Sequence, residues 1–546
     1  MSRSSRPLPR GLIGCAAIAV AAVLAGCGGS GSSSSGTGPQ ASAPGSGKSV
    51  ANVTWAISYP VKTLDPGLVY DGGGNNFMAY QECDSMLRFG ENLKLEPEIA
   101  SSWKEASPTS YVYTIRPDVK FWDGNPVTPA DVAFSINRIQ DKALASPLAS
   151  LAGAGSIKTA EVTGAHEVTV KLSSPNPIAQ WLPATPVGQV VEKTFAQKLG
   201  SKFGNSVSNV MCSGAYRPVT WNKGSETILR AVPHYWDSAH QPHIKQVTFQ
   251  EVKDSATIVA GLRSGDISGT FDVSARDAQS LKSDPNLSVA VGQSGNPNYI
   301  SPNLLKGPLK NPLIRRAFSL AIDRAGLASA TDGSAGEPLK GPVPPGLTTF
   351  QDAFFTKAYN SLPLSVSPQI AAAKKLVQQA HAAGTKFTIA ALAGGTTDTV
   401  AAELQQAGQS IGLNVNVLKL PSADFFTESF SGKEPRTYDG LLNFWAPDFP
   451  DPSALLVPPF GSKFSNVEGY FDPAYTALEK TWSMTKNGSL AQAQVLSKME
   501  HMLIDKTVKI PLTVTPLVQI HKKSFGGYQQ TKIFIYQPFM LYMSGN

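Results

Sequence analysis

The chain has 546 residues, of which 42% are hydrophobic and 16% charged, and this is too long for one core of ordinary size. The formal net charge is +7, and removal of a leader that contains Arg3, Arg6 and Arg10 would reduce it to +4. So small and dispersed a charge argues against nucleic-acid binding. The composition predicts a soluble globular protein of two or three domains.

The N-terminus has the form of a secretory leader. Three arginines precede an apolar run over residues 11–24, which is too short for a comfortable membrane-spanning helix. The run ends in Leu24-Ala25-Gly26-Cys27, which resembles a bacterial lipobox, in which the cysteine becomes the lipidated first residue. We expect a signal peptide over residues 1–26 and a membrane anchor at Cys27. A plain secretory signal with a chance cysteine is the alternative.

Residues 27–49 are rich in Gly and Ser and predict a flexible linker. Beyond the leader and Cys27, the only cysteines are Cys83 and Cys212. An exported protein meets an oxidising compartment, which favours a disulfide between them, and two buried free thiols are the alternative. Neither cysteine belongs to a CxxC or has a histidine at zinc spacing, so we expect no metal site.

Hydrophobic periodicity predicts different secondary structure in the two halves of the chain. Alternating patterns predict strands over residues 53–58, 111–115, 167–172, 227–232 and 247–252. Thr128, Pro129 and Asp131 have the N-cap, first-turn and N3 chemistry that opens a helix. Strand 387–392, a helix to Ile411 and strand 414–420 form a βαβ pattern with parallel strands. The second half therefore has α/β character, and the first half is richer in strands.

The stretch 443–452, Asn-Phe-Trp-Ala-Pro-Asp-Phe-Pro-Asp-Pro, predicts a stiff, irregular loop. It follows a predicted strand over residues 438–444. Phe444 and Trp445 beside Asp448 suit a cationic or amphipathic small ligand. The alternative is an ordinary proline-rich turn with surface acids.

Tyr299 and Asn303 are further candidates for ligand binding. They lie just before the second half begins, where a two-lobed chain would cross between its lobes, and clefts between lobes bind ligands. The alternative for Tyr299 is a place in the core of a strand.

We expect no catalytic residue and no cofactor. Residues 408–412 match G-x-S-x-G, but the nucleophile elbow needs a strand before Ser410 and a helix after it, and here the order is reversed. His240 and His243 lack further ligands at metal spacing and predict a surface loop. The basic pair Arg315-Arg316 predicts a solvated helix face.

An ordered set of short motifs resembles the extracellular family 5 solute-binding lipoproteins, the peptide, dipeptide and nickel receptors of bacterial ABC importers. In chain order the motifs are 64–66, 99–103, 113–116, 121–124, 128–134, 213–216, 235–236, 263–267, 315–324 and 447–452. Each motif alone is weakly specific, whereas the ordered set is specific. The one departure is Ala215, which stands where the family usually has proline.

The resemblance implies an α/β, two-lobed periplasmic-binding-protein-like fold of type II, with a hinge between the lobes and an additional inserted α+β domain. The implied boundaries are 50–84, 186–296 and 515–546 for lobe 1, 85–185 for the inserted domain and 297–514 for lobe 2.

The resemblance also implies a function. In the peptide receptors of the family, an aspartate in a Trp-x-x-Asp stretch pairs with the ligand's α-amino group, and this role maps onto Asp448, with Trp445 beside it. The expected protein is a monomeric, lipid-anchored receptor on the extracytoplasmic face of the cell membrane that passes peptides to ABC permease subunits and their ATPases. No arginine for the peptide carboxylate stands out, and Arg436 is the nearest candidate. A nickel chelate, a sugar or another small molecule is the alternative ligand, and an exported hydrolase is a more distant alternative.

Overall fold

The computed structural model describes residues 45–70, 74–90, 93–421, 424–425, 427–428, 437–457, 466–528 and 536–546. Cys27 and Arg436 lie outside these residues. Within the described ranges, no helix combines the length and the apolar character that crossing a membrane requires.

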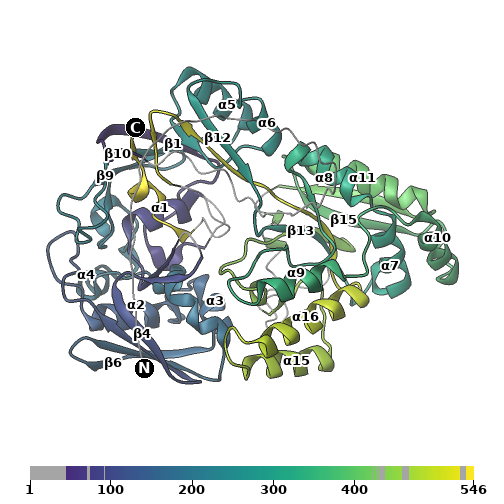
Figure 1. The fold of residues 1–546 in the computed structure, drawn as a ribbon, viewed down its shortest axis with the longest axis horizontal. Coiled ribbons are helices and arrows are strands. Elements are labelled where there is room, and N and C mark those ends of the chain that lie inside the picture. The colour runs from purple at the N-terminus through teal and green to yellow at the C-terminus, as the bar shows by residue number, and fades with distance from the viewer. Residues whose placement is uncertain are drawn as a thin grey trace, which may run out of the picture. The chain divides into compact units, whose positions relative to one another are not determined.

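The first large sheet has seven strands and is built from distant parts of the chain (Figure 1). In spatial order its strands are β12 (Leu287–Gly292), β19 (Leu517–Lys522), β11 (Gly269–Thr270), β1 (Val50–Ile57), β10 (Ile244–Glu251), β9 (Glu226–Ala231) and β8 (Tyr216–Asn222). β1 runs parallel to both of its neighbours. In β10 the buried Val247 and Phe249 lie two residues apart on one face, as a strand with one face in the core requires, and Ile244 at the start of the strand is buried as well.

The second large sheet has six strands, all from the second half of the chain. In spatial order they are β14 (Glu337–Pro338), β18 (Ile510–Val514), β13 (Pro297–Pro302), β17 (Gly440–Phe444), β15 (Lys386–Leu392) and β16 (Asn414–Leu420). β15 and β16 are parallel and are joined by helix α11 (Thr397–Ser410), which confirms the predicted βαβ unit. With helices beside both sheets, the structure confirms the predicted α/β class.

A third sheet has four strands, in the order β4 (Ala100–Ser107), β5 (Ser110–Ile115), β7 (Glu167–Leu172) and β6 (Ile157–Gly164). Helix α2 (Pro129–Ile139) packs against it. The predicted start of α2 is confirmed: the Thr128 side chain accepts the Asp131 N–H, and Asp131 accepts the Thr128 N–H at 2.9 Å, a capping box. Two short pairs are β2 (Leu87–Phe89) with β3 (Leu95–Pro97) and β20 (Phe525–Gly526) with β21 (Ser544–Gly545).

Within the described ranges, the other α-helices connect or cover these sheets. They are α1 (Gly74–Glu82), α3 (Leu148–Ala154), α4 (Lys193–Leu199), α5 (Ser255–Ser264), α6 (Ala275–Gln279), α7 (Pro312–Ala321), α8 (Arg324–Asp332), α9 (Asp352–Asn360), α10 (Ile370–Gln379), α13 (Ser453–Leu456), α15 (Pro473–Ser483) and α16 (Leu490–Asp505).

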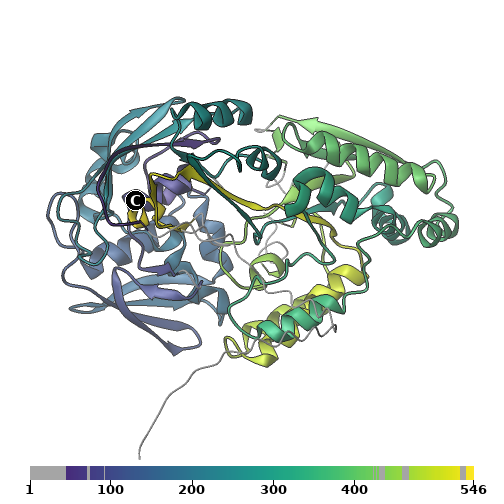
Figure 2. The same cartoon turned by 45° about the horizontal axis from the view of Figure 1, so that its top comes forward.

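Two short connections join the seven-stranded and six-stranded sheets. One links β12 to β13, and the other links β18 to β19, seen in yellow in Figure 2. The connections are bonded to each other: the Thr515 N–H donates to the Asn296 carbonyl at 3.0 Å, and the Ser294 hydroxyl donates to the Thr515 carbonyl. The implied domain boundaries as a set stay a prediction.

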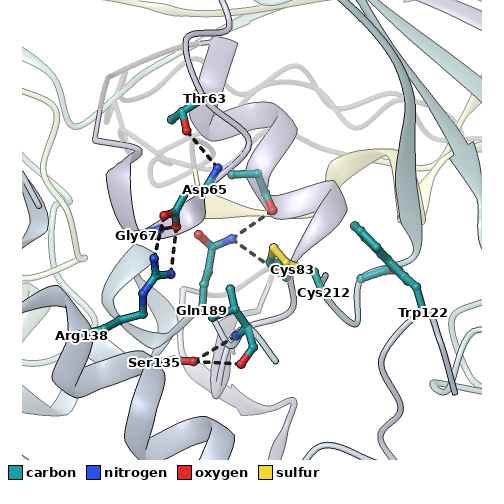
Figure 3. The surroundings of a disulfide bond; sticks show 12 residues. Thr63, Asp65, Gly67, Cys83, Trp122, Ser135, Arg138, Gln189 and Cys212 are labelled. Atoms are coloured by element: carbon teal, nitrogen blue, oxygen red, sulfur yellow. Dashed lines mark hydrogen bonds and ion pairs between the residues drawn. A yellow bond between two sulfur atoms is a disulfide. The ribbon is translucent and has the colours of Figure 1, made fainter. Parts of the chain in front are cut away.

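A disulfide joins Cys83, just after α1, to Cys212, with Cα atoms 4.9 Å apart (Figure 3). Beside it, Gln189 donates its amide to the carbonyls of Ala79 and Cys83, at 3.1 and 3.0 Å. Both sulfurs lie in residues that are at most 1% exposed, so the bridge is an internal one.

The Leu64-Asp65-Pro66 motif has a structural explanation. Asp65 is 1% exposed and accepts two hydrogen bonds from the guanidinium of Arg138, at 3.0 and 2.7 Å (Figure 3). It also accepts the Gly67 N–H at 2.9 Å, which opens a single 3-10 turn. This bidentate pair ties the segment after β1 to helix α2.

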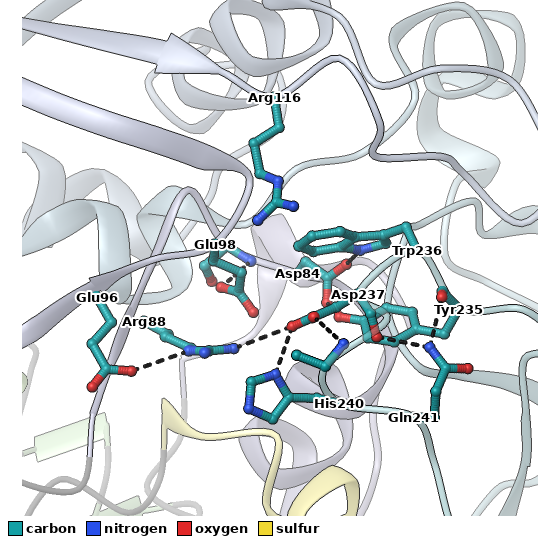
Figure 4. A network of polar contacts seen from close by, with 12 residues as sticks. Asp84, Arg88, Glu96, Glu98, Arg116, Tyr235, Trp236, Asp237, His240 and Gln241 are labelled. Atoms are coloured by element: carbon teal, nitrogen blue, oxygen red, sulfur yellow. Dashed lines mark hydrogen bonds and ion pairs between the residues drawn. The ribbon is translucent and has the colours of Figure 1, made fainter.

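The Tyr235-Trp236 motif belongs to a second network of polar contacts (Figure 4). Tyr235 and Trp236 donate to separate oxygens of the buried Asp84, at 2.8 and 2.6 Å. Burial raises the pKa of Asp84, and these two donors oppose the rise. At the edge of the network, Asp237 accepts from His240 at 2.8 Å, and the Arg88 guanidinium lies 3.6 Å away. The motif thus holds the connection between β9 and β10 against the segment after α1.

The prediction for Arg315 was wrong. Its side chain is 6% exposed and donates to the carbonyls of Lys506 at 2.9 Å and Thr507 at 3.0 Å. These carbonyls follow the end of α16, where backbone acceptors lack partners within the helix. Arg315 therefore caps a neighbouring helix, a role that its own helix's sequence does not reveal.

Glu500 in α16 provides a test of pH-dependent stability. It is 6% exposed and accepts the Val343 N–H at 3.3 Å, and burial raises its pKa from 4.5 to about 8. The Glu500 carboxyl group therefore holds its proton more tightly in the folded chain than in the unfolded chain. The stabilisation is complete below pH 4.5 and is lost as the pH rises through 8, by up to about 1.4 kcal/mol per pH unit.

We expect the Glu500→Gln variant to keep this stabilisation as the pH rises, because glutamine cannot ionise. In urea unfolding from pH 4.5 to 8.5, the variant should gain stability relative to the wild type as the pH rises. Parallel stability profiles for the two proteins would show that Glu500 does not titrate in this range.

Candidate ligand-binding site

The proline-rich loop, residues 445–452, follows a strand, β17, as predicted, and leads into α13. β17 pairs with β13, and the Trp445 N–H donates to the Pro297 carbonyl at 3.3 Å, which fixes the start of the loop. At its end, Asp451 is 1% exposed and accepts the Ser453 N–H at 2.8 Å. The loop is therefore held at both ends, and Asp448 lies between them.

Asp448 is buried, with 3% of its surface exposed, and accepts two hydrogen bonds. The Tyr536 hydroxyl donates to Oδ1 at 2.5 Å, and the Tyr70 hydroxyl donates to Oδ2 at 3.1 Å. Tyr70 follows β1, and Tyr536 lies near the C-terminal end of the chain. Three distant parts of the sequence thus meet at one carboxyl group.

The electrostatics of Asp448 are those of a buried anion. Burial raises its pKa to about 6, and the hydrogen bonds from Tyr536 and Tyr70 oppose that rise. Burial also raises the pKa of both tyrosines, so their hydroxyls remain donors at neutral pH. Above pH 6 the carboxyl is therefore ionised. No lysine, arginine or histidine within the described ranges forms an ion pair with it.

The aromatic candidates of the loop differ in exposure. Phe444 is 37% exposed and stacks on Phe425, with ring centroids 6.1 Å apart. Trp445 is half-buried and packs against the core. Phe449 is fully buried and stacks on Trp181 at 6.3 Å. Phe444 and Trp445 thus flank the start of the loop, and Phe449 anchors its middle.

Tyr299 and Asn303 are both 2% exposed. The Lys509 ammonium lies 3.8 Å from the centroid of the Tyr299 ring and forms an ion pair with Glu468 at 2.9 Å. The Asn303 Oδ1 accepts the N–H of Leu305 at 3.0 Å, which shapes a turn after β13. The structure thus places these two residues in packing and turn positions, and their contact with a ligand stays a prediction.

Sequence reasoning missed Tyr70 and Tyr536. A buried aspartate requires hydrogen-bond donors, so the need for partners was foreseeable. Their positions were not, because they come from segments 378 and 88 residues away from Asp448.

The described residues hold no group of three His, Cys, Asp or Glu side chains that could bind a metal ion. Ser410 ends α11, ahead of strand β16, and its hydroxyl donates to the Ala407 carbonyl at 2.7 Å. This is the reverse of the order that a nucleophile elbow needs.

Residues 94–466, more than half of the chain, match the sequence profile of the bacterial extracellular solute-binding proteins, family 5. The chain belongs to this family. It is therefore a bacterial extracellular solute-binding protein, which confirms the predicted family.

Curated relatives and solved structures extend the likeness to most of the chain. The periplasmic oligopeptide-binding protein OppA of Salmonella typhimurium is 25% identical over 491 residues, 86% of this chain and 88% of that protein. The fold matches DppA from Helicobacter pylori in complex with the peptide STSA, with a TM-score of 0.79 at 20% identity, over 91% of this chain and 99% of that one. It also matches AgaA from Agrobacterium tumefaciens in complex with agropinic acid, with a TM-score of 0.76 at 19% identity, over 91% and 99% of the two chains. These likenesses confirm the predicted fold.

Proposed function

We propose that this solute-binding protein is the peptide receptor of an ABC importer, and that Asp448 binds the α-ammonium group of the peptide. The observation that carries the proposal is the state of Asp448: a buried carboxylate with two neutral donors and no cation among the described side chains. A buried charge is costly unless an opposite charge and hydrogen bonds compensate it. A ligand ammonium supplies both.

Two further observations support a peptide. The oligopeptide-binding relative covers most of this chain, and one of the matching folds holds a tetrapeptide. An exposed Phe444 and a half-buried Trp445, which lie just before and at the start of the loop that carries Asp448, offer apolar surface for the first side chains of a peptide. Peptide backbone groups would pair with strand ends and loops around the site.

A small non-peptide solute is the second candidate, because the same fold holds agropinic acid in AgaA. Mass spectrometry of the small molecules released when the purified protein is denatured separates the two. Recovery of short peptides with free amino termini supports the peptide receptor. Recovery of a sugar, a metal chelate or an opine-like acid alone contradicts it.

The receptor would be held at the extracytoplasmic face of the membrane by acyl chains on Cys27 and would deliver its ligand to the permease subunits. The lipobox-like sequence Leu24–Cys27 supports this proposal. The intact mass of the membrane-extracted protein tests it: residues 1–26 should be missing and the mass of acyl chains present. An unmodified N-terminal cysteine would contradict the anchor.

A further inference from the structure

The contacts of Asp448 show how its charge is maintained. Its two oxygens are bound by different phenols, Tyr536 on Oδ1 at 2.5 Å and Tyr70 on Oδ2 at 3.1 Å. An ionised carboxylate has about four acceptor positions, so each oxygen keeps one for a further donor. An ammonium group, with three donors, therefore has acceptor positions on Asp448 that neither tyrosine uses.

We propose that Tyr70 and Tyr536 are positioning residues that keep the carboxylate of Asp448 ionised and oriented for a ligand's ammonium group. This inference rests on the proposed function and explains how a carboxylate that is only 3% exposed is ready for a cation at neutral pH. Hydrogen bonds to the charged form of an acid favour that form and oppose the effect of burial. The two phenols also fix the plane of the carboxyl group, because they bind its two oxygens from separate segments.

Among the described residues, a third phenol also interacts with Asp448. Tyr80 of α1 stacks on Tyr536, with centroids 5.6 Å apart, but its hydroxyl donates to the Ala184 carbonyl at 3.2 Å. It thus shares the buried surroundings of the other two tyrosines without a hydrogen bond to the carboxylate. Tyr80→Phe is therefore a matched control for the loss of one buried hydroxyl.

The test measures the pH dependence of peptide binding in Tyr536→Phe, Tyr70→Phe and Tyr80→Phe by calorimetry. The probes are trialanine and its N-acetylated form, from pH 5 to 8.5. For the wild type, affinity for trialanine should fall as the pH drops through about 6. Loss of one charged hydrogen bond should move this midpoint upward by about one pH unit in Tyr536→Phe and Tyr70→Phe. Tyr80→Phe should keep the wild-type midpoint.

A second measurement needs no ligand. Infrared difference spectroscopy follows the protonated carboxyl band of Asp448, assigned by its absence in Asp448→Asn, in the wild type and the three Phe variants. The same upward shift is expected for Tyr536→Phe and Tyr70→Phe.

The outcomes separate the two proposals. Midpoints that match the wild type in both Tyr536→Phe and Tyr70→Phe, with trialanine still preferred over its acetylated form, overturn this inference and leave the proposed function standing. Equal wild-type affinity for trialanine and N-acetyl-trialanine at every pH overturns the amine-binding role of Asp448, and this inference with it. An upward shift that also appears in Tyr80→Phe overturns the inference as well, because burial alone would then explain it.

Discussion

Replacement of Asp448 by asparagine should weaken binding of peptides with a free amino terminus by about 2–4 kcal/mol, or about 30- to 1,000-fold. Asparagine has nearly the same shape, and its amide can bond to the hydroxyls of Tyr70 and Tyr536, because a phenol oxygen also accepts. The loss would therefore report the missing charge. Calorimetric titration with free and N-acetylated forms of one peptide measures it.

The Asp448→Asn variant should no longer distinguish the free peptide from its N-acetylated form. The wild type should prefer the free amine, whereas Asp448→Asn should bind the two forms with similar affinity and little dependence on pH between 5 and 8. Asp451→Asn is the matched control, because Asp451 is also buried in the same loop but accepts its hydrogen bond from Ser453, the first residue of α13. Preserved discrimination in Asp448→Asn would remove this residue from the amine site.

The second large effect is expected at Lys509, whose ammonium group is buried with Glu468. Lys509→Met should lower the free energy of unfolding by about 3–5 kcal/mol, because it leaves the Glu468 carboxylate buried without its cation. Glu468 depends on this partner: Oε1 accepts from Lys509 at 2.9 Å and from Ser301 at 2.7 Å, and Oε2 has no partner among the described residues. Urea unfolding measures the change.

A double variant distinguishes loss of a charge pair from loss of packing. Lys509→Met combined with Glu468→Gln removes both charges and keeps an acceptor for the Ser301 hydroxyl. It should recover most of the stability that the single Lys509→Met variant loses. A double variant as unstable as the single one would show that packing around Tyr299, and not the unpaired carboxylate, dominates.

The sequence predicted those helices and strands that are determined by residues close to one another in the chain. The start of α2 follows from Thr128 and Asp131, three residues apart, which cap each other. Strand 167–172 was predicted at the bounds that β7 has.

The candidate site could be predicted only in part. The sequence singled out Asp448 because carboxylate, aromatic and proline residues lie together in one loop. It could not show that Tyr70 and Tyr536 meet this carboxylate, since no local pattern relates residues from opposite ends of a chain. The same limit explains Arg315 in part: its helix shows a basic pair, but two of the four carbonyls that it binds, those of Lys506 and Thr507, lie more than 190 residues away in the sequence.

The two connections between the large sheets have a mechanical consequence. Since the Ser294–Asn296 segment and Thr515 are hydrogen-bonded to each other, we expect the two crossings to bend together. Rotation about a single axis is then the easiest relative movement of the two sheets. Such a protein would open and close about one hinge axis. A pair of fluorophores, one on each sheet's helices, should therefore report ligand capture as one distance change, which makes this fold a suitable frame for an optical sensor.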